Sequence, residues 1–599
     1  MKKINWTLIL LMLNLAVISG VVIGYLNMRF PLVGNDHRGV ASMLDSYIYF
    51  RLNGLSIQWF SPSFGGGLPA FPDPNNAQFS LLHLLLFLVS PWQAVMISTV
   101  IFIIIGGCGS FYFFHRLLNL HWTASILGMV FFIATGYYME RISAGHLAFQ
   151  TFPLLVILII ALLDLSIPRG IAGVIFALVI TIMINQGGFI LIVTFGLSLL
   201  VIFPLLYLYR YEIISWKHLV SVAAIGLLVT LVMSASKVAA VFAFMRFFPR
   251  QLEDYYPGTS ILRGLFGIVL QLLGTMNLAP LLKLVGSDPG LLPNYMVSVT
   301  GAPYGYWEFD MSMSPVVFGI IIVGVYSFLR KPKKYPGLLM QNNKWIAWIF
   351  FIFFTWIAIE FTLAKGWIYP LLQNLPILSS LHVNPRFAAA FLFPLAFIAA
   401  VIYNSWAAKW SAKKSLYIFL VVNLVALIPL STYFMIKTDL QDRLYDITTS
   451  QVIYNQIRSG NNLTITGISL DASNTQALLL HESNLQPYEP IFGYDLESFH
   501  PEIVPGSVWM VTDGYYNMTN PSGYVFPEVN GTRPFERVKV GDEANLTLFL
   551  NHQKTNWKIP VYQEVLDWVS GLTFWFVLAL LVLYPIYRVL KSRRARRAA

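Results

Sequence analysis

The chain alternates long apolar runs with shorter polar segments. Many of the runs approach twenty residues, the length that an α-helix needs to cross roughly 30 Å of hydrocarbon. The pattern therefore predicts an all-α polytopic membrane protein with about twelve transmembrane helices. The helices are expected at 5–27, 92–114, 122–138, 152–167, 170–185, 187–208, 218–236, 314–330, 345–363, 387–405, 415–436 and 567–588.

Three polar segments interrupt these spans, at 28–91, 237–313 and 437–566. The first contains a predicted short helix from Asp45 to Trp59, and its apolar run at 79–90 is too short to cross a membrane. The second is unusually apolar for a loop, which predicts helices lying along the membrane surface. We expect both to be outer loops of a transmembrane module at 1–436.

The third polar segment has the composition of a separate external domain. Short alternating or β-branched stretches are separated in it by Asn, Gly and Pro, a pattern typical of short strands. Strands are predicted at 463–470, 476–480, 507–511, 523–529 and 545–550. We therefore predict a small C-terminal β-rich extracytoplasmic domain at 437–566, followed by a final transmembrane helix and basic cytoplasmic tail at 567–599.

The amino-acid composition agrees with a membrane protein, and the positions of Lys and Arg predict its topology. The chain is 57% apolar and 11% charged, whereas a soluble domain is about 45–50% apolar and about 25% charged. The twelve-span arrangement places 20 of the 39 Lys and Arg residues at cytoplasmic ends, opposed there only by Asp164 and Glu212. Basic residues in short loops set orientation during insertion, so the net charge of +11 indicates topology and we expect no nucleic-acid partner.

Several classes of chemistry lack their sequence signals. Cys108 is the single cysteine, which excludes a disulfide within the chain and a cysteine-based metal site. The sequence contains no phosphate-binding loop of the Walker type, no dinucleotide-binding glycine motif, and no metalloprotease or serine-hydrolase motif. Nucleotide-driven transport therefore has no support in the sequence.

The informative residues are ionisable side chains next to the outer ends of the predicted spans. An ionisable side chain at the centre of a membrane helix costs roughly 2.5–3.5 kcal/mol on insertion scales. Ionisable side chains that lie close to the spans are therefore candidates for a function. They are Asp36, Glu140, Arg141, His146, Lys237, Arg246, Arg250, Glu308, Asp310, Lys365, His382 and Arg386.

Carboxylates and cations at one depth could line a cavity at the outer leaflet. A carboxylate can take the proton of an attacking hydroxyl, and Lys or Arg can stabilise a departing phosphate. The combination suits glycosyl transfer from a lipid-linked sugar phosphate. Simpler roles stand beside it: Asp36 as a solvated loop residue, His146 and His382 as helix caps, and Arg246 and Arg250 as ligands of lipid headgroups.

The order of short motifs along the membrane part resembles the GT-C superfamily of integral-membrane glycosyltransferases, especially its YfhO-type branch. The resemblance extends from the first outer loop to the tenth span. It rests on Asp36, Asp45-Ser46-Tyr47, Leu52-Asn53-Gly54, Trp59, Gly65-Gly66-Gly67-Leu68-Pro69, Gly145-His146, Ser236-Lys237, Phe248-Pro249-Arg250, Glu308, Leu375-Pro376 and Pro385-Arg386.

The resemblance implies a polyprenyl-phosphate sugar donor, transfer on the outer face, and inversion at the anomeric carbon. It makes Asp36 the general base, with Asp45 as the alternative for that position. The residues implied for the donor phosphate are Lys237, Arg246, Arg250 and Arg386. Those implied to line the substrate are Asp45, Glu140, His146, Glu308 and His382. We predict no cofactor and no metal, with a divalent cation as an open alternative.

The leading prediction is a glycosyltransferase of the cell envelope in the cytoplasmic membrane of a prokaryote, with both termini in the cytoplasm. Its partners would be the lipid-linked donor, a glycan, lipid or polymer acceptor, and membrane lipids. A transporter or flippase of a lipid-linked saccharide is the alternative; transporters hold ionisable groups near the bilayer midplane, where these spans have few. A scaffold that recruits a partner through its external domain is a third possibility.

Overall fold

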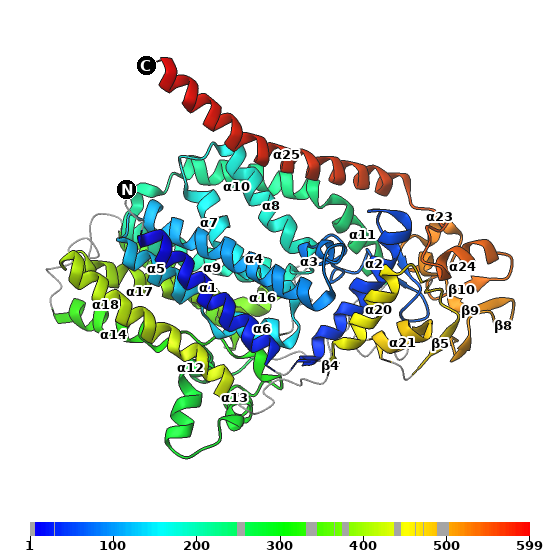
Figure 1. Cartoon of the computed structure of the whole chain (residues 1–599), viewed down its shortest axis with the longest axis horizontal. Helices are drawn as coiled ribbons and strands as arrows, with labels where there is room; N and C mark the ends of the chain where they lie inside the picture. Colours follow the sequence, from blue (N-terminus) through cyan, green and yellow to red (C-terminus); the bar gives the residue numbers. More distant parts are fainter. Residues whose placement is uncertain are drawn as a thin grey trace.

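A computed structural model describes residues 6–28, 30–247, 258–330, 344–363, 366–373, 383–435, 445–461, 463–470, 473–487 and 502–598. Helices dominate it, and most are packed side by side in one bundle (Figure 1). The strands collect beyond one end of this bundle, and both chain termini lie toward the opposite end.

Ten helical segments in the described residues are long and apolar enough to cross a membrane. This confirms a polytopic α-helical membrane protein. The segments are Trp6–Asn27, Pro91–Leu117, Trp122–Ala144, Phe189–Ile213, Trp216–Met233, Ile261–Leu284, Trp345–Thr362, Asn384–Ala407, Ala412–Phe434 and Val561–Arg588. They contain α1 (Trp6–Asn27), α4 (Pro91–Tyr112), α5 (Trp122–Ile133), α6 (Gly136–Ala144), α9 (Phe189–Arg210), α10 (Trp216–Met233), α12 (Ile261–Leu284), α15 (Lys344–Thr362), α17 (Leu392–Ala407), α18 (Ala412–Leu427) and α25 (Val561–Ala598).

Four further apolar helical segments are shorter. Three of them, Leu147–Leu163, Arg169–Asn185 and Pro315–Arg330, fall where full spans are predicted. The fourth, Ala235–Met245, continues from the predicted span at 218–236. The shorter segments include α7 (Leu155–Leu163), α8 (Arg169–Asn185), α11 (Ala235–Met245) and α14 (Pro315–Arg330). Nine of the twelve predicted spans therefore match long segments and three match shorter ones, because an apolar run in sequence does not show where a helix ends.

Helix α12 is the largest departure from the predicted spans. Its residues were expected to lie along the membrane surface, but α12 is a 24-residue apolar helix. It is interrupted at Gly274, whose φ of 45° and ψ of −157° leave the helical region. The interruption releases carbonyls, and the oxygens of Gln271 and Leu272 accept hydrogen bonds from Met311 N and Met313 N at 3.1 and 3.0 Å. Because buried carbonyls need partners in a membrane, the segment after Glu308 is fixed against this break.

The region at 445–560 mixes short strands with helices. Its described strands are β4 (Tyr445–Asp446), β5 (Gly467–Ser469), β6 (Glu482–Asn484), β7 (Gly506–Ser507), β8 (Val511–Thr512), β9 (Tyr515–Thr519) and β10 (Arg537–Lys539). They form the sheets β6-β5-β7 and β10-β9-β8, while β4 pairs elsewhere. Its described helices include α20 (Thr448–Arg458), α21 (Asn474–Leu480), α23 (Pro527–Asn530) and α24 (Glu543–Leu550).

Three of the predicted strands are wrong, because the structure has helical segments there. The stretch at 476–480 lies in α21, where Ser473 and Gln476 form a capping box that satisfies the first amide groups. The stretch at 523–529 lies across a 3-10 turn and α23, and 545–550 lies in α24. A β-rich character is therefore limited to short pieces in the described part of this region.

The segment between α1 and α4 and the region at 445–560 fold together. Strand β1 (Leu32–Val33) pairs antiparallel with β4, and α2 (Val40–Asn53) lies beside α20, with Tyr47 stacked on Tyr454 at 5.6 Å (Figure 1). The hairpin of β2 (Phe60–Ser61) and β3 (Leu68–Pro69) reaches β9, where Thr519 N donates to the Gly66 carbonyl at 2.8 Å. Two segments more than 400 residues apart in sequence thus form one unit next to the bundle.

Candidate functional site

Two glycine turns bring the segment after α1 against the end of α6. Gly34 begins the short helix η1 (Asn35–Gly39), and a Cβ at this position would overlap the backbone of Ser143 and Ala144. Gly145 ends α6 with a φ of 107°, and a Cβ there would overlap the backbone of Asp36 and of the residue after it. Only residues without a side chain permit such a close approach, so these glycines determine where Asp36 lies.

Asp36 faces His146 across this contact. The Oδ2 atom of Asp36 lies 2.5 Å from Nε2 of His146. The position of His146 follows from the end of α6, because its backbone N–H donates to the Arg141 carbonyl at 3.0 Å in the turn that Gly145 closes. The sequence thus places a carboxylate and an imidazole side by side from two loops that are far apart in the chain.

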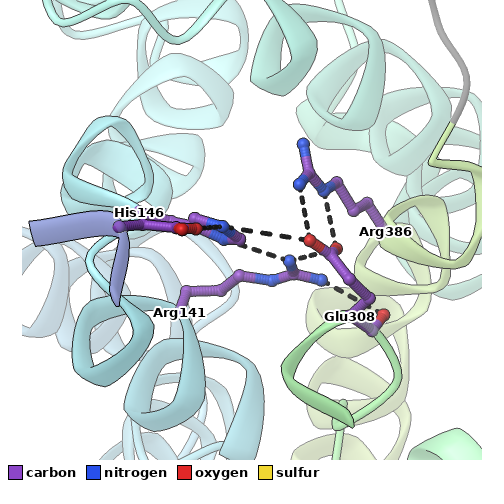
Figure 2. A network of polar contacts seen from close by, with 5 residues as sticks. Arg141, His146, Glu308 and Arg386 are labelled. Atoms are coloured by element: carbon purple, nitrogen blue, oxygen red, sulfur yellow. Dashed lines mark hydrogen bonds and ion pairs between the residues drawn. The ribbon is translucent and has the colours of Figure 1, made fainter. Parts of the chain in front are cut away.

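Glu308 is the centre of a buried ion cluster next to this pair (Figure 2). It ends the turn η6 (Tyr306–Glu308). Arg386 donates through Nε and Nη2 to its two carboxylate oxygens at 2.6 and 2.5 Å, a bidentate arrangement that fixes both orientation and distance. Arg141 Nη1 pairs with Oε2 of the same carboxylate, and Arg141 Nη2 donates to the Glu308 carbonyl at 3.1 Å.

The two arginines control the charge of Glu308. Burial alone would raise the pKa of this carboxyl, but the guanidinium groups of Arg141 and Arg386 lower it far below its ordinary value. Glu308 is therefore ionised throughout the physiological range. One carboxylate neutralises one of two guanidinium charges, so the cluster retains a net positive charge apart from Asp36.

Phe149 forms one wall of the cluster. It lies in η3 (Leu147–Leu154), and its ring centroid is 5.3 Å from the Arg141 guanidinium carbon and 5.5 Å from that of Arg386. The His146 ring lies 5.6 Å from it. An aromatic ring next to a guanidinium group stabilises its charge by cation–π attraction.

Part of the cluster is accessible. The side chains of Asp36, His146 and Arg386 are 20%, 12% and 19% exposed, whereas those of Arg141 and Glu308 are 0% and 6% exposed. In Figure 2 the end of the Arg386 guanidinium that does not contact Glu308 points away from the other drawn side chains. Among the described residues, Nη1 of Arg386 has no hydrogen-bond acceptor. The accessible groups are therefore an acid, an imidazole and one face of a guanidinium.

Glu140 does not join this cluster. It is fully buried, and Tyr25 donates to its Oε1 at 3.2 Å. Consecutive helical residues point about 100° apart, so Glu140 and Arg141 face different neighbours. On that side the equally buried Asp310 accepts a hydrogen bond from the Tyr433 hydroxyl at 2.9 Å.

Asp45 has a separate environment. It is buried between the segment that joins α1 to α4 and the region at 445–560, where Gln58 Nε2 donates to its Oδ2 at 2.6 Å and the Ser63 hydroxyl donates to its Oδ1. His552 Nδ1 lies 3.3 Å from the same Oδ1. Burial raises the pKa of Asp45, but the contacts with His552, Ser63 and Gln58 outweigh it and hold that pKa below its ordinary value of 3.8. These contacts use both oxygens of Asp45 to join two parts of the fold.

Lys237 also holds structure together. Its Nζ donates to the carbonyls of Phe71, Asp73 and Asn76 at 2.7, 2.6 and 3.2 Å, and it lies 4.9 Å from the Phe71 ring centroid. An ammonium group has three N–H donors, and these contacts use all three. Lys237 therefore anchors the loop at 71–76 to α11.

The other predicted site residues lie elsewhere. The Arg246 side chain is 70% exposed, and its Nη1 lies 3.4 Å from Glu528. Arg250, Lys365 and His382 fall outside the residues that the structure describes. The structure therefore brings together Asp36, His146, Glu308 and Arg386 from the predicted set.

Sequence reasoning gave no role to Arg141 or Phe149. Arg141 was noted only as a charge at the end of a span, although an arginine at the end of an apolar run usually needs a buried partner. Phe149 carries no distinguishing sequence signal, because the chain is rich in aromatic residues. Its role depends on a fold that brings two arginines close to its ring.

Within the described ranges, no three His, Cys, Asp or Glu side chains gather closely enough to hold a metal ion.

Comparison of the sequence with protein-family models and with curated proteins, and of the structure with solved structures, finds no match. What the site does must therefore be argued from its own geometry.

Proposed function

We propose that the protein is an integral-membrane glycosyltransferase that moves a sugar from a polyprenyl-phosphate donor to a hydroxyl group of a glycan, lipid or polymer. The observation that carries this proposal is the Asp36–His146 pair lying against the cluster of Arg386, Arg141 and Glu308. A candidate base and a candidate phosphate-binding cation are thus within one accessible patch, as glycosyl transfer from a sugar phosphate requires.

The reaction assigns one event to each group. The acceptor oxygen forms a bond to the anomeric carbon while its proton passes to the Asp36 carboxylate. The bond between the anomeric carbon and the phosphate oxygen breaks, and the electron pair leaves with the polyprenyl phosphate. A single displacement of this kind inverts the anomeric carbon.

Arg386 is the cation best placed for the leaving phosphate. Its bidentate pairing with Glu308 fixes the guanidinium plane, and the Nη1 end remains accessible. A preorganised donor of this kind stabilises charge as it develops without reorganising. Lys237 and Arg246 are not assigned this role, because Lys237 donates to three carbonyls and Arg246 lies on the surface.

The test replaces the proposed base. Purified Asp36→Asn protein in detergent would be given undecaprenyl-phosphate hexoses and pentoses with labelled sugars, with cell-envelope glycan as the acceptor. Transfer is expected to fall by about 100-fold or more, since a positioned general base contributes roughly 10²–10⁴-fold. Asp513→Asn, in an exposed turn of the region at 445–560, is the matched control and should transfer normally. Unchanged transfer by a folded Asp36→Asn protein would contradict the role of Asp36.

One observation favours transport as a second candidate. The break in α12 at Gly274 resembles the discontinuous helices that line transporter binding sites. The buried Asp310 beside it would then bind a coupling ion or proton. If wild-type protein moved a labelled polyprenyl-phosphate sugar across vesicles and transferred none of it, transport would replace glycosyl transfer as the proposed function.

A further inference from the structure

Glu308, Arg141 and His146 contact one another in series (Figure 2). Asp36 continues this series at the other ring nitrogen of His146. We propose that Arg141 holds His146 in the tautomer with its proton on Nε2, so that His146 acts as a fixed hydrogen-bond donor to Asp36. His146 is then a positioning residue that orients the base and does not itself take the reaction's proton. This inference rests on the proposed function for its purpose, although the tautomer can be measured without any activity.

The tautomer follows from the donors and acceptors on the two sides of the ring. Arg141 Nη1 lies 3.3 Å from Nδ1 of His146. A guanidinium can only donate, so Nδ1 must accept and carries no hydrogen. A neutral imidazole then has its hydrogen on Nε2, the atom that lies 2.5 Å from the Asp36 carboxylate.

The buried arginine cannot turn away from this contact without loss. Arg141 is 0% exposed, it pairs with the Glu308 carboxylate, and its Nη2 donates to the Glu308 carbonyl at 3.1 Å. The Tyr137 and Phe149 rings lie 5.5 and 5.3 Å from its guanidinium carbon. Glu308 thus orients Arg141, and Arg141 in turn sets the hydrogen position of His146.

This arrangement also decides where the proton goes. Around His146 lie Asp36 and Glu308 on the Nε2 side, at 2.5 and 3.9 Å, and Arg141 on the Nδ1 side. A second proton on the ring would have to bind Nδ1 and would break the contact with Arg141. The proton taken from the acceptor therefore stays on Asp36 until it leaves to solvent or product.

The tautomer can be observed directly. The protein would be labelled with ¹⁵N-histidine in detergent, and the His146 signals assigned by their loss in His146→Gln. At about pH 7 we expect the shift of a protonated Nε2 and an unprotonated Nδ1. Arg141→Lys, which keeps the charge but not the fork geometry, should allow both tautomers. A doubly protonated ring in the wild type, or a hydrogen on Nδ1, would overturn the proposal.

Activity provides a second readout through a pair of replacements. Glutamine can place an N–H near the Nε2 position, whereas asparagine reaches only the Nδ1 position. His146→Gln should therefore keep transfer within about 5-fold, while His146→Asn should lose up to about 100-fold in kcat, the scale of a misplaced catalytic group. His115→Gln, at an exposed histidine just beyond the C-terminal end of α4, is the matched control.

The outcomes separate this inference from the proposed function. Equal large losses in His146→Gln and His146→Asn, with both proteins folded by thermal unfolding, would mean that the ring itself takes a proton, and the inference would fail. If wild-type protein shows the expected tautomer but transfers no labelled sugar, the inference about His146 stands and the proposed glycosyltransferase function is refuted.

Discussion

Glu308 carries a full negative charge although its side chain is only 6% exposed. Burial of an ion pair costs several kcal/mol per charge, and removal of one partner typically destabilises by about 3–5 kcal/mol. A cluster of one carboxylate and two guanidinium groups is therefore an expensive way to stabilise a fold. Under the proposed function, its accessible edge at Arg386 and Asp36 is where the donor phosphate and the acceptor bind.

At the same scale, Asp45 gives a prediction about pH. Its folded pKa lies below the ordinary value of 3.8, so its carboxylate stabilises the fold above that value. The stabilisation is lost as the pH falls from 3.8 toward the folded pKa. Asp45→Asn should lower the free energy of unfolding by about 2 kcal/mol near neutral pH, because the hydrogen bonds to a charged acceptor are lost.

The difference between wild type and Asp45→Asn should narrow when thermal unfolding in detergent is repeated below about pH 4. Asp446→Asn, which replaces an exposed carboxylate in β4, serves as the control and should change the free energy of unfolding little. A difference that stayed constant or widened in acid would contradict the assigned role of Asp45.

At the scale of elements, the site depends on the contact between η1 and the end of α6. Neither segment carries the site alone, because Asp36 belongs to one and His146 to the other. The contact is backbone against backbone at Gly34 and Gly145. Small residues at such contacts allow the close approach on which the side-chain geometry depends.

Gly145→Ala is therefore expected to separate Asp36 from His146. The new methyl group would overlap the backbone of Asp36 and also require a φ of 107°. Stability should fall by more than about 1 kcal/mol, and transfer should fall with it. Gly196→Ala, where a Cβ meets nothing within 4 Å, is the matched control. Thermal unfolding and transfer that match the wild type in Gly145→Ala would contradict this account.

At the scale of the whole molecule, the strands of the region at 445–560 lie beyond one end of the bundle, and the chain termini lie toward the opposite end. Arg210 at the far end donates to the Leu117 carbonyl at 3.2 Å, so α4 and α9 end together there. The proposed orientation places this basic end in the cytoplasm, as the distribution of Lys and Arg indicates.

Single cysteines can test that orientation. In a Cys108→Ser background, a membrane-impermeant maleimide should label Asp513→Cys on intact cells, because this exposed turn lies in the region at 445–560, which is predicted to be extracytoplasmic. Lys409→Cys, in the exposed connection between α17 and α18, should react only after the membrane is permeabilised. The reverse pattern would place the candidate site on the cytoplasmic face and would remove the predicted topology.

The sequence by itself determined the class of protein and the rim residues from which the site is built. Apolar runs near twenty residues require membrane helices, and rare charges beside them draw attention to Asp36, His146, Glu308 and Arg386. It did not separate Asp36 from Asp45, since both are acidic residues of the same loop.

The tertiary structure decided which charges meet. Helix ends depend on capping and on neighbours, so three predicted strands are helical and α12 is an interrupted membrane helix. Partners depend on long-range packing, which buries Asp45 against His552 and Lys237 against three carbonyls, and leaves Asp36 facing His146. These pairings join residues from 110 to 507 positions apart, a range over which local sequence pattern carries no distance information.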